Sequence, residues 1–116
     1  MPRTNVIQEK SCRFSLKIIQ LIKHLPRRTE GFVIGNQILR SGTSIGANVE
    51  EAIAGFSKED FTYKMNIAVK EARETKYWLR LISDSRLIET GCGSLIQKCD
   101  ELVKILTSIV KTSQGK

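Results

Sequence analysis

Apolar residues recur at steps of three and four along four segments of this chain, and this spacing constrains the fold more than any other feature. Side chains three and four positions apart lie on one face of an α-helix, so each segment predicts an amphipathic helix. No segment shows the sustained apolar and polar alternation that is typical of a half-buried strand. We therefore expect an all-α chain with helices over residues 5–25, 31–55, 58–84 and 92–113.

Each expected helix presents one apolar seam, which small residues interrupt in places. The seams consist of Ile7, Ser11, Phe14, Ile18, Leu21 and Leu25 in the first helix, Ile34, Ile38, Gly42, Ile45, Val49, Ala52 and Phe56 in the second, Phe61, Met65, Ala68, Ala72, Thr75, Leu79 and Ile82 in the third, and Leu95, Cys99, Leu102, Leu106 and Ile109 in the fourth. Pro26 is expected to end the first helix, and Ser57 to cap the third. Because the connections are short, neighbouring helices should run antiparallel. The sequence predicts one domain over residues 1–116, an up-down-up-down four-helix bundle.

The stretch RSGTSIGANVEEA, residues 40–52, places glycines and polar groups in the middle of the second expected helix. The seam continues through Gly42, which indicates close packing against another helix. Beside the seam runs a second stripe made of Arg40, Ser44, Asn48 and Glu51. We interpret this stripe as a partly buried polar network in which Arg40 pairs with Glu51, or with Glu74 on the third helix.

Two catalytic interpretations of the same stretch are less favourable. A phosphate-binding glycine loop needs free backbone amides at a strand-to-helix turn, but these glycines lie inside an expected helix. A catalytic site would need a base and a nucleophile close together. His24 is the one histidine, and it is far in sequence from the acidic groups of the stripe. The three cysteines, Cys12, Cys92 and Cys99, form no C-x-x-C pair, so neither a disulfide framework nor a metal site is indicated. We expect no enzymatic activity and no cofactor.

The third expected helix has a second stripe away from its seam. It is formed by Tyr63, Ile67, Glu74, Trp78 and Leu81. One seam suffices for the core of a bundle, so a second stripe with the only tryptophan predicts an interface with another copy of the chain through Tyr63, Ile67, Trp78 and Leu81. The alternative is that the bundle turns this helix enough to bury both faces.

Positive charge is concentrated in the first part of the chain. Residues 1–40 contain eight Lys or Arg and two acids, so their net charge is +6. The formal net charge of the whole chain is +7. The candidate contacts for an acidic partner are the row Lys10, Arg13 and Lys17, followed by Arg27 and Arg28. No aromatic residue shares the face of this row, because Phe14, between Arg13 and Lys17, belongs to the apolar seam. Contacts with RNA or DNA should therefore be mainly to phosphate. A protein-binding adaptor without a nucleic-acid role is the alternative function, and ordinary solubility charge is the plainest explanation.

The remaining expectations concern location. The longest apolar runs are far shorter than the roughly 20 residues that span a bilayer. The first residues, MPRTNVIQEK, contain no apolar signal core. We therefore expect a cytoplasmic protein without a membrane segment.

Two successive motifs resemble the four-helix-bundle proteins encoded in intervening sequences of bacterial 23S ribosomal RNA genes. That family has a Q-x-x-R-x-x-x-S-I-x-x-N-x-x-E pattern, followed by a helix with K-E-x-x-E and then aromatic residues and leucine. Here the first motif is filled by Gln37, Arg40, Ser44, Ile45, Asn48 and Glu51, and the second by Lys70, Glu71, Glu74, Tyr77, Trp78 and Leu79. The sequence ETGCGS departs from the more acidic, helix-forming start that the family pattern suggests for the last helix.

This resemblance implies properties that the residues alone do not indicate. It implies a homo-oligomeric ring, with a homopentamer as the expected assembly. It also implies kinship to the accessory proteins of diversity-generating retroelements, which are basic rings that bind nucleic acid and a reverse transcriptase. A reverse transcriptase is thus an expected partner by family kinship only.

Overall fold

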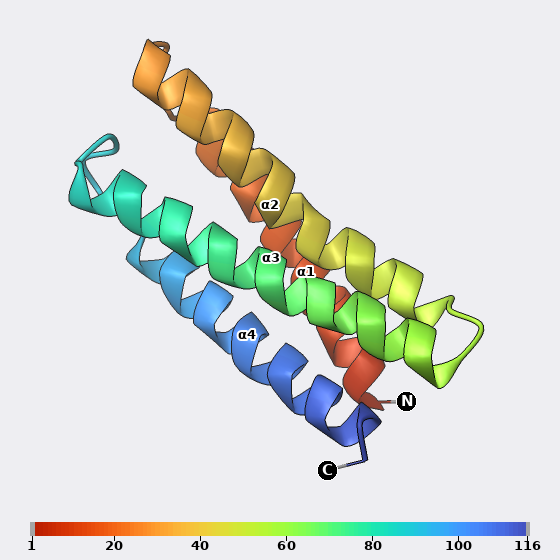
Figure 1. Cartoon of the computed structure of the whole chain (residues 1–116). Helices are drawn as coiled ribbons and strands as arrows, with labels where there is room; N and C mark the ends of the chain where they lie inside the picture. The colour runs from red at the N-terminus through yellow and green to blue at the C-terminus, as the bar shows by residue number, and fades with distance from the viewer. Residues whose placement is uncertain (1, 116) are drawn as a thin grey trace.

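The computed structural model describes the backbone of residues 2–115 and the side chains of residues 4–115. It contains four α-helices, α1 (Pro2–Ile22), α2 (Thr29–Ile53), α3 (Lys58–Asp84) and α4 (Gly93–Ser113). They form an elongated bundle of 45 × 21 × 18 Å, and no strand occurs among the described residues (Figure 1). The prediction of an all-α chain with four helices is confirmed.

Each helix packs against two neighbours. Helix α1 contacts α2 and α4, and α3 contacts the same two helices, while no Cα atoms of the two diagonal pairs lie within 8 Å of each other in residues 2–115. The chain turns back at each connection, so that the start of α1 and the end of α4 lie at the same end of the bundle (Figure 1). This arrangement places α1 and α4, which are far apart in sequence, side by side.

The first two helices begin and end earlier than expected, since α1 starts at Pro2 rather than at residue 5 and α2 ends at Ile53 rather than at residue 55. The largest consequence is around Pro26. Helix α1 ends at Ile22, three residues before the predicted end, and α2 begins at Thr29. A residue before proline avoids the helical conformation, so the chain leaves the helix before Leu25. The amide of Leu25 donates instead to the Ile22 carbonyl oxygen at 3.2 Å, in a tight turn. Helix α3 has the predicted bounds, and α4 begins one residue later than expected.

The apolar seams form the core, as predicted. Phe14, Ile38, Met65, Leu79 and Leu106 are among the fully or almost fully buried side chains. The prediction is wrong for Phe56, whose side chain is 101% exposed. Helix α2 ends at Ile53, so Phe56 lies in the connection to α3 and no longer follows the helical period.

Small residues let α1 and α2 approach each other closely. A Cβ atom on Gly42 would lie 3.0 Å from the Cγ1 atom of Ile18, and one on Gly31 would lie 2.2 Å from the carbonyl oxygen of Pro26. The second distance is impossible for real atoms, so only glycine fits at position 31. Gly42, the glycine on the seam of α2, thus has the packing role that the sequence indicated.

The start of α3 is capped as the sequence predicted. The backbone amide of Asp60 donates to the Ser57 hydroxyl at 3.0 Å, which satisfies one of the unpaired amides at a helix start. Among the described residues, none of the helices has the length and apolar character needed to cross a bilayer.

Candidate nucleic-acid interface

A groove between α1 and α4 brings together the basic row of α1 and residues of α4. It is lined by Lys10, Arg13, Phe14, Lys17, Lys98, Glu101 and Leu102. Phe14 and Leu102 are almost fully buried, so they form an apolar floor below the charged side chains. The three predicted α1 residues therefore share one surface, and α4 adds Lys98 to it.

Lys98 was missed because the sequence does not show which helices are neighbours. It precedes the seam residue Leu102 by one helical turn, just as Lys10 precedes Phe14. Cations beside the seams of two helices meet in one groove once those helices lie side by side. The signal that could have found Lys98 is this shared position relative to the seam, combined with the packing of the first helix against the last.

Two of the four cations in the groove have carboxylate partners. Lys10 Nζ lies 3.0 Å from a carboxylate oxygen of Glu101, and the guanidinium of Arg13 pairs with Glu9 one turn earlier on α1. Lys17 and Lys98 form no ion pair with any side chain that the structure describes. The four cations thus outnumber the two carboxylates, and the groove has an excess of positive charge.

The existing ion pairs do not prevent a phosphate from entering. The Lys10 and Glu101 side chains are 41% and 53% exposed, so water screens their attraction. Such exposed pairs contribute at most about 1 kcal/mol. A phosphate group can therefore displace a carboxylate at small cost.

Arg27 and Arg28 lie elsewhere, at the turn between α1 and α2. They line a second pocket together with Pro26, Phe32 and other residues of the turn. Arg28 lies 3.8 Å from Glu30, whereas Arg27 has no ion pair with a side chain in the described part of the chain. The five predicted nucleic-acid contacts therefore fall on two separate surfaces.

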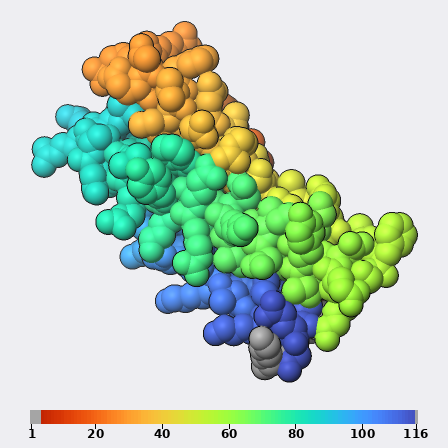
Figure 2. Space-filling model, in the orientation of Figure 1, coloured from red at the N-terminus to blue at the C-terminus, as the bar shows by residue number. Residues whose placement is uncertain are grey.

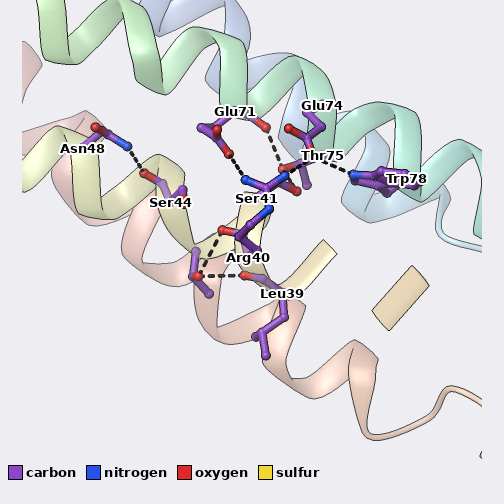
Figure 3. Close-up of polar contacts among 10 residues, drawn as sticks. Leu39, Arg40, Ser41, Ser44, Asn48, Glu71, Glu74, Thr75 and Trp78 are labelled. Carbon is purple, nitrogen blue, oxygen red and sulfur yellow. Dashed lines mark hydrogen bonds and ion pairs between the residues drawn. The ribbon is translucent and has the colours of Figure 1, made fainter. Parts of the chain in front are cut away.

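The polar network around Arg40 joins α2 to α3 (Figure 3). Arg40 Nη1 lies 3.2 Å from a carboxylate oxygen of Glu71, and the same guanidinium pairs with Glu74. Glu74 also accepts a hydrogen bond from Trp78 Nε1 at 2.9 Å. The predicted pairing with Glu74 is confirmed, and Glu71 is a further partner that the sequence interpretation did not include.

The alternative pairing of Arg40 with Glu51 is wrong. Glu51 accepts instead from Lys64 Nζ at 2.7 Å, and this hydrogen bond raises the pKa of Lys64. The reason is geometric, since Glu51 lies about three helical turns beyond Arg40 on α2 and faces an earlier part of α3. Asn48 donates to the Ser44 carbonyl oxygen at 2.9 Å (Figure 3). Both residues are on α2, so this hydrogen bond does not link α2 to α3.

The ion-pair network around Arg40 is only partly buried. The Arg40 side chain is 50% exposed, while those of Glu71 and Glu74 are 19% and 34% exposed. The buried polar contact between these helices is the hydrogen bond between the Ser41 and Thr75 hydroxyls, at 2.9 Å. The desolvated polar part of the interface is thus formed by the small hydroxyl residues Ser41 and Thr75, next to the ion pairs.

The second stripe of α3 is divided between core and surface. Trp78 packs against the core of its own chain and against the edge of Tyr77, while Ile67 and Leu81 are half-buried. Tyr63 is 64% exposed. The bundle therefore covers part of this stripe, and Tyr63 is its most accessible residue.

The cysteines provide no reactive thiolate in the core. Burial raises the pKa of the Cys99 thiol to about 12, and the thiol donates to the Ala72 carbonyl oxygen at 3.1 Å. Burial also raises the pKa of Cys92, whereas Cys12 is exposed. Within the described residues, no three His, Cys, Asp or Glu side chains are grouped so that they could hold a metal ion.

Comparisons with known proteins agree with the motifs in the sequence. The family model of the 23S rRNA-intervening sequence protein matches residues 3–108. A crystal structure from Bacteroides thetaiotaomicron, described as a protein of unknown function from the S23 ribosomal protein family, is 45% identical to this chain, with a TM-score of 0.86. The match covers 94% of this chain and 98% of that one. No functionally curated protein matches the chain. On this evidence, the chain belongs to the 23S rRNA-intervening sequence protein family.

Proposed function

We propose that this protein is a non-enzymatic, antiparallel four-helix bundle that assembles into a homo-oligomeric ring and binds RNA or DNA through the groove between α1 and α4. The observation that supports this function is the convergence of Lys10, Arg13, Lys17 and Lys98 along one groove, with Lys17 and Lys98 free of carboxylate partners in the described part of the chain. Lysine and arginine side chains in such a row match the regular negative charge of a phosphate backbone.

The groove favours phosphate contacts over base contacts. It has no aromatic side chain at its surface, because Phe14 is almost fully buried in the floor. Lysine and arginine contacts to phosphate hold a nucleic acid in place without reading its sequence. Binding through this groove therefore varies little with sequence and weakens steeply as salt concentration rises.

Repetition of the groove in a ring strengthens weak contacts. One subunit contributes two unpaired cations, which is few for stable binding. When several grooves lie on one assembly, each further contact is intramolecular and its effective concentration is high. The family resemblance supports a ring, and the exposed Tyr63 on α3 supports the predicted subunit face.

The assembly is tested by the mass of the native protein. Tyr63→Arg is the sharper variant for this test because Tyr63 is 64% exposed, whereas a charged residue at Trp78 also disrupts the core of the same chain. We expect the wild type to be larger than 13.1 kDa in multi-angle light scattering and Tyr63→Arg to form smaller species. A wild type that stays monomeric at micromolar concentration excludes the ring.

The binding surface is tested by charge reversal. Fluorescence anisotropy with labelled RNA and duplex DNA, over a series of salt concentrations, compares wild type with Lys17→Glu/Lys98→Glu. The matched control is Lys104→Glu/Lys111→Glu, which makes the same charge change at exposed positions of α4 outside the groove. We expect the groove variant to bind at least about tenfold more weakly than the control, with a shallower salt dependence.

Two outcomes count against the proposal. If the groove variant and the control bind equally, total charge rather than the groove determines the affinity. If the wild type binds neither RNA nor DNA at low salt, the protein is better explained as a protein-binding adaptor or scaffold. In that case the basic surface serves an acidic protein partner.

A further inference from the structure

The turn between α1 and α2 combines positive charge with an aromatic ring that is open to solvent. Pro26, Arg27, Arg28, Phe32 and Asn36 line the same pocket there. The Phe32 side chain is 70% exposed. This turn forms one end of the elongated molecule, at the orange tip in Figure 2. A pocket at an end of the bundle is accessible to a large ligand such as a nucleic-acid strand.

The position of Phe32 is set by the packing of the glycines beside it. Gly31 lies directly against the Pro26 carbonyl oxygen, and a Cβ atom on Gly35 would lie 3.2 Å from the Leu25 side chain. These contacts press one face of α2 onto the turn. The amide of Phe32 donates to the Arg28 carbonyl oxygen at 2.8 Å, so Phe32 belongs to the first ordered turn of the helix. The ring is therefore attached to a fixed backbone.

The charges around Phe32 are mostly unpaired. Residues 20–36 contain three basic side chains, Lys23, Arg27 and Arg28, against the single carboxylate of Glu30. Glu30 is 3.8 Å from Arg28, and Arg27 has no ion pair within the described residues. Two guanidinium groups beside an exposed ring provide both parts of a nucleotide contact, since the cations attract phosphate and the ring offers a face to a base.

We propose that this turn binds an unpaired nucleotide of single-stranded RNA or DNA, with the base stacked on Phe32 and its phosphate held by Arg27 and Arg28. Asn36 adds an amide that can donate to or accept from the edge of the base. Bases inside a duplex are stacked on each other and cannot offer a free face to Phe32. The turn therefore distinguishes single strands from duplexes, which the α1–α4 groove does not.

A second copy of the chain is a less favourable occupant of this pocket. If two copies met symmetrically at this turn, Arg27 and Arg28 of both would face each other, and like charges repel. The inference shares with the proposed function only the class of ligand, because it uses a different surface. The two can thus fail independently.

The test compares aromatic residues at the two ends of α2. Affinity for a short single-stranded RNA that contains one 2-aminopurine is measured for wild type, Phe32→Ala, Phe32→Tyr and Phe56→Ala. Phe56 is the matched control because its side chain is fully exposed but it does not line the basic pocket. We expect Phe32→Ala to bind the single strand about tenfold more weakly. Phe32→Tyr and Phe56→Ala should bind like wild type.

Duplex RNA and the native mass complete the test. Binding of a duplex should be the same for wild type and Phe32→Ala, and the change in 2-aminopurine fluorescence should be lost in Phe32→Ala alone. The inference is overturned if Phe32→Ala binds the single strand as wild type does, if it loses duplex binding equally, or if it changes the mass of the assembly. It is also overturned if wild type binds no single strand. If the groove variant has no effect but Phe32→Ala does, the groove proposal fails and this inference stands.

Discussion

The α2–α3 and α1–α4 interfaces show two ways in which one bundle handles charge. Helices α2 and α3 make the most extensive contact between any two helices in the structure, and α1 and α4 make the least extensive. In the first interface, Arg40 has two carboxylate partners and the Ser41 and Thr75 hydroxyls are hydrogen-bonded. In the second, the four cations outnumber the carboxylates. Close packing thus requires internal pairing of polar groups, whereas a more open interface leaves charges available to a ligand.

The largest expected effect tests whether stability resides in the core beside α2 and α3. Leu79 is fully buried, so Leu79→Ala should reduce the free energy of unfolding by about 2 to 5 kcal/mol, through lost burial and a cavity. Leu16→Ala is the control, because Leu16 is 56% exposed on α1. Urea denaturation measures both. Equal losses for the two variants would show that the core does not lie where the structure places it.

The next effect concerns the buried hydroxyl pair. Thr75→Val removes one partner and leaves the Ser41 hydroxyl unsatisfied, which should cost about 1 to 3 kcal/mol of unfolding free energy. In the double variant Ser41→Ala/Thr75→Val neither hydroxyl remains, so part of that loss should be recovered. A double-mutant cycle by thermal or urea denaturation measures the coupling. Strictly additive losses would mean that the two hydroxyls do not interact.

A smaller effect is expected at Arg40. Because its side chain is 50% exposed, Arg40→Ala should lower the free energy of unfolding by only about 1 kcal/mol. A fully desolvated network would lose about 3 to 5 kcal/mol on the same substitution. A urea titration of the variant separates these values. A loss in the higher range would indicate that assembly buries this network.

The smallest effect is expected in the groove. Lys17→Ala/Lys98→Ala should change the free energy of unfolding by no more than about 0.5 kcal/mol, since neither side chain has an ion-pair partner among the described residues. Thermal denaturation is sufficient to detect a larger change. A clear loss of stability would mean that these lysines have a structural role, which removes the contrast between the two interfaces.

The fold could be predicted from the sequence because it depends on local periodicity. Every predicted seam residue from Ile38 to Ala52 is buried, since the period holds throughout α2. Phe56 was placed wrongly because the helix ends at Ile53, and the end of a helix depends on capping and chain reversal more than on apolar spacing. Periodicity therefore predicts the interior of an element better than its boundary.

The candidate site could be predicted only in part, because a site depends on which elements meet. The row Lys10, Arg13 and Lys17 was visible as a pattern on one helix. Lys98 comes from another helix, and its contribution depends on the packing of α1 against α4. Likewise, the sequence analysis did not connect Arg27 with an aromatic residue, but the turn between α1 and α2 places Phe32 in the same pocket.

The central claim is that the α1–α4 groove binds phosphate. It is tested most directly by two separate variants, one that neutralises a negative charge in the groove and one that neutralises a positive charge. Glu101 competes with phosphate for Lys10, whereas Lys98 is free to contact phosphate. We expect Glu101→Gln to tighten the binding of labelled RNA at low salt and Lys98→Gln to weaken it, with both proteins as stable as wild type. Unchanged affinity in both variants, or a change of the same sign in both, contradicts the assignment of the groove.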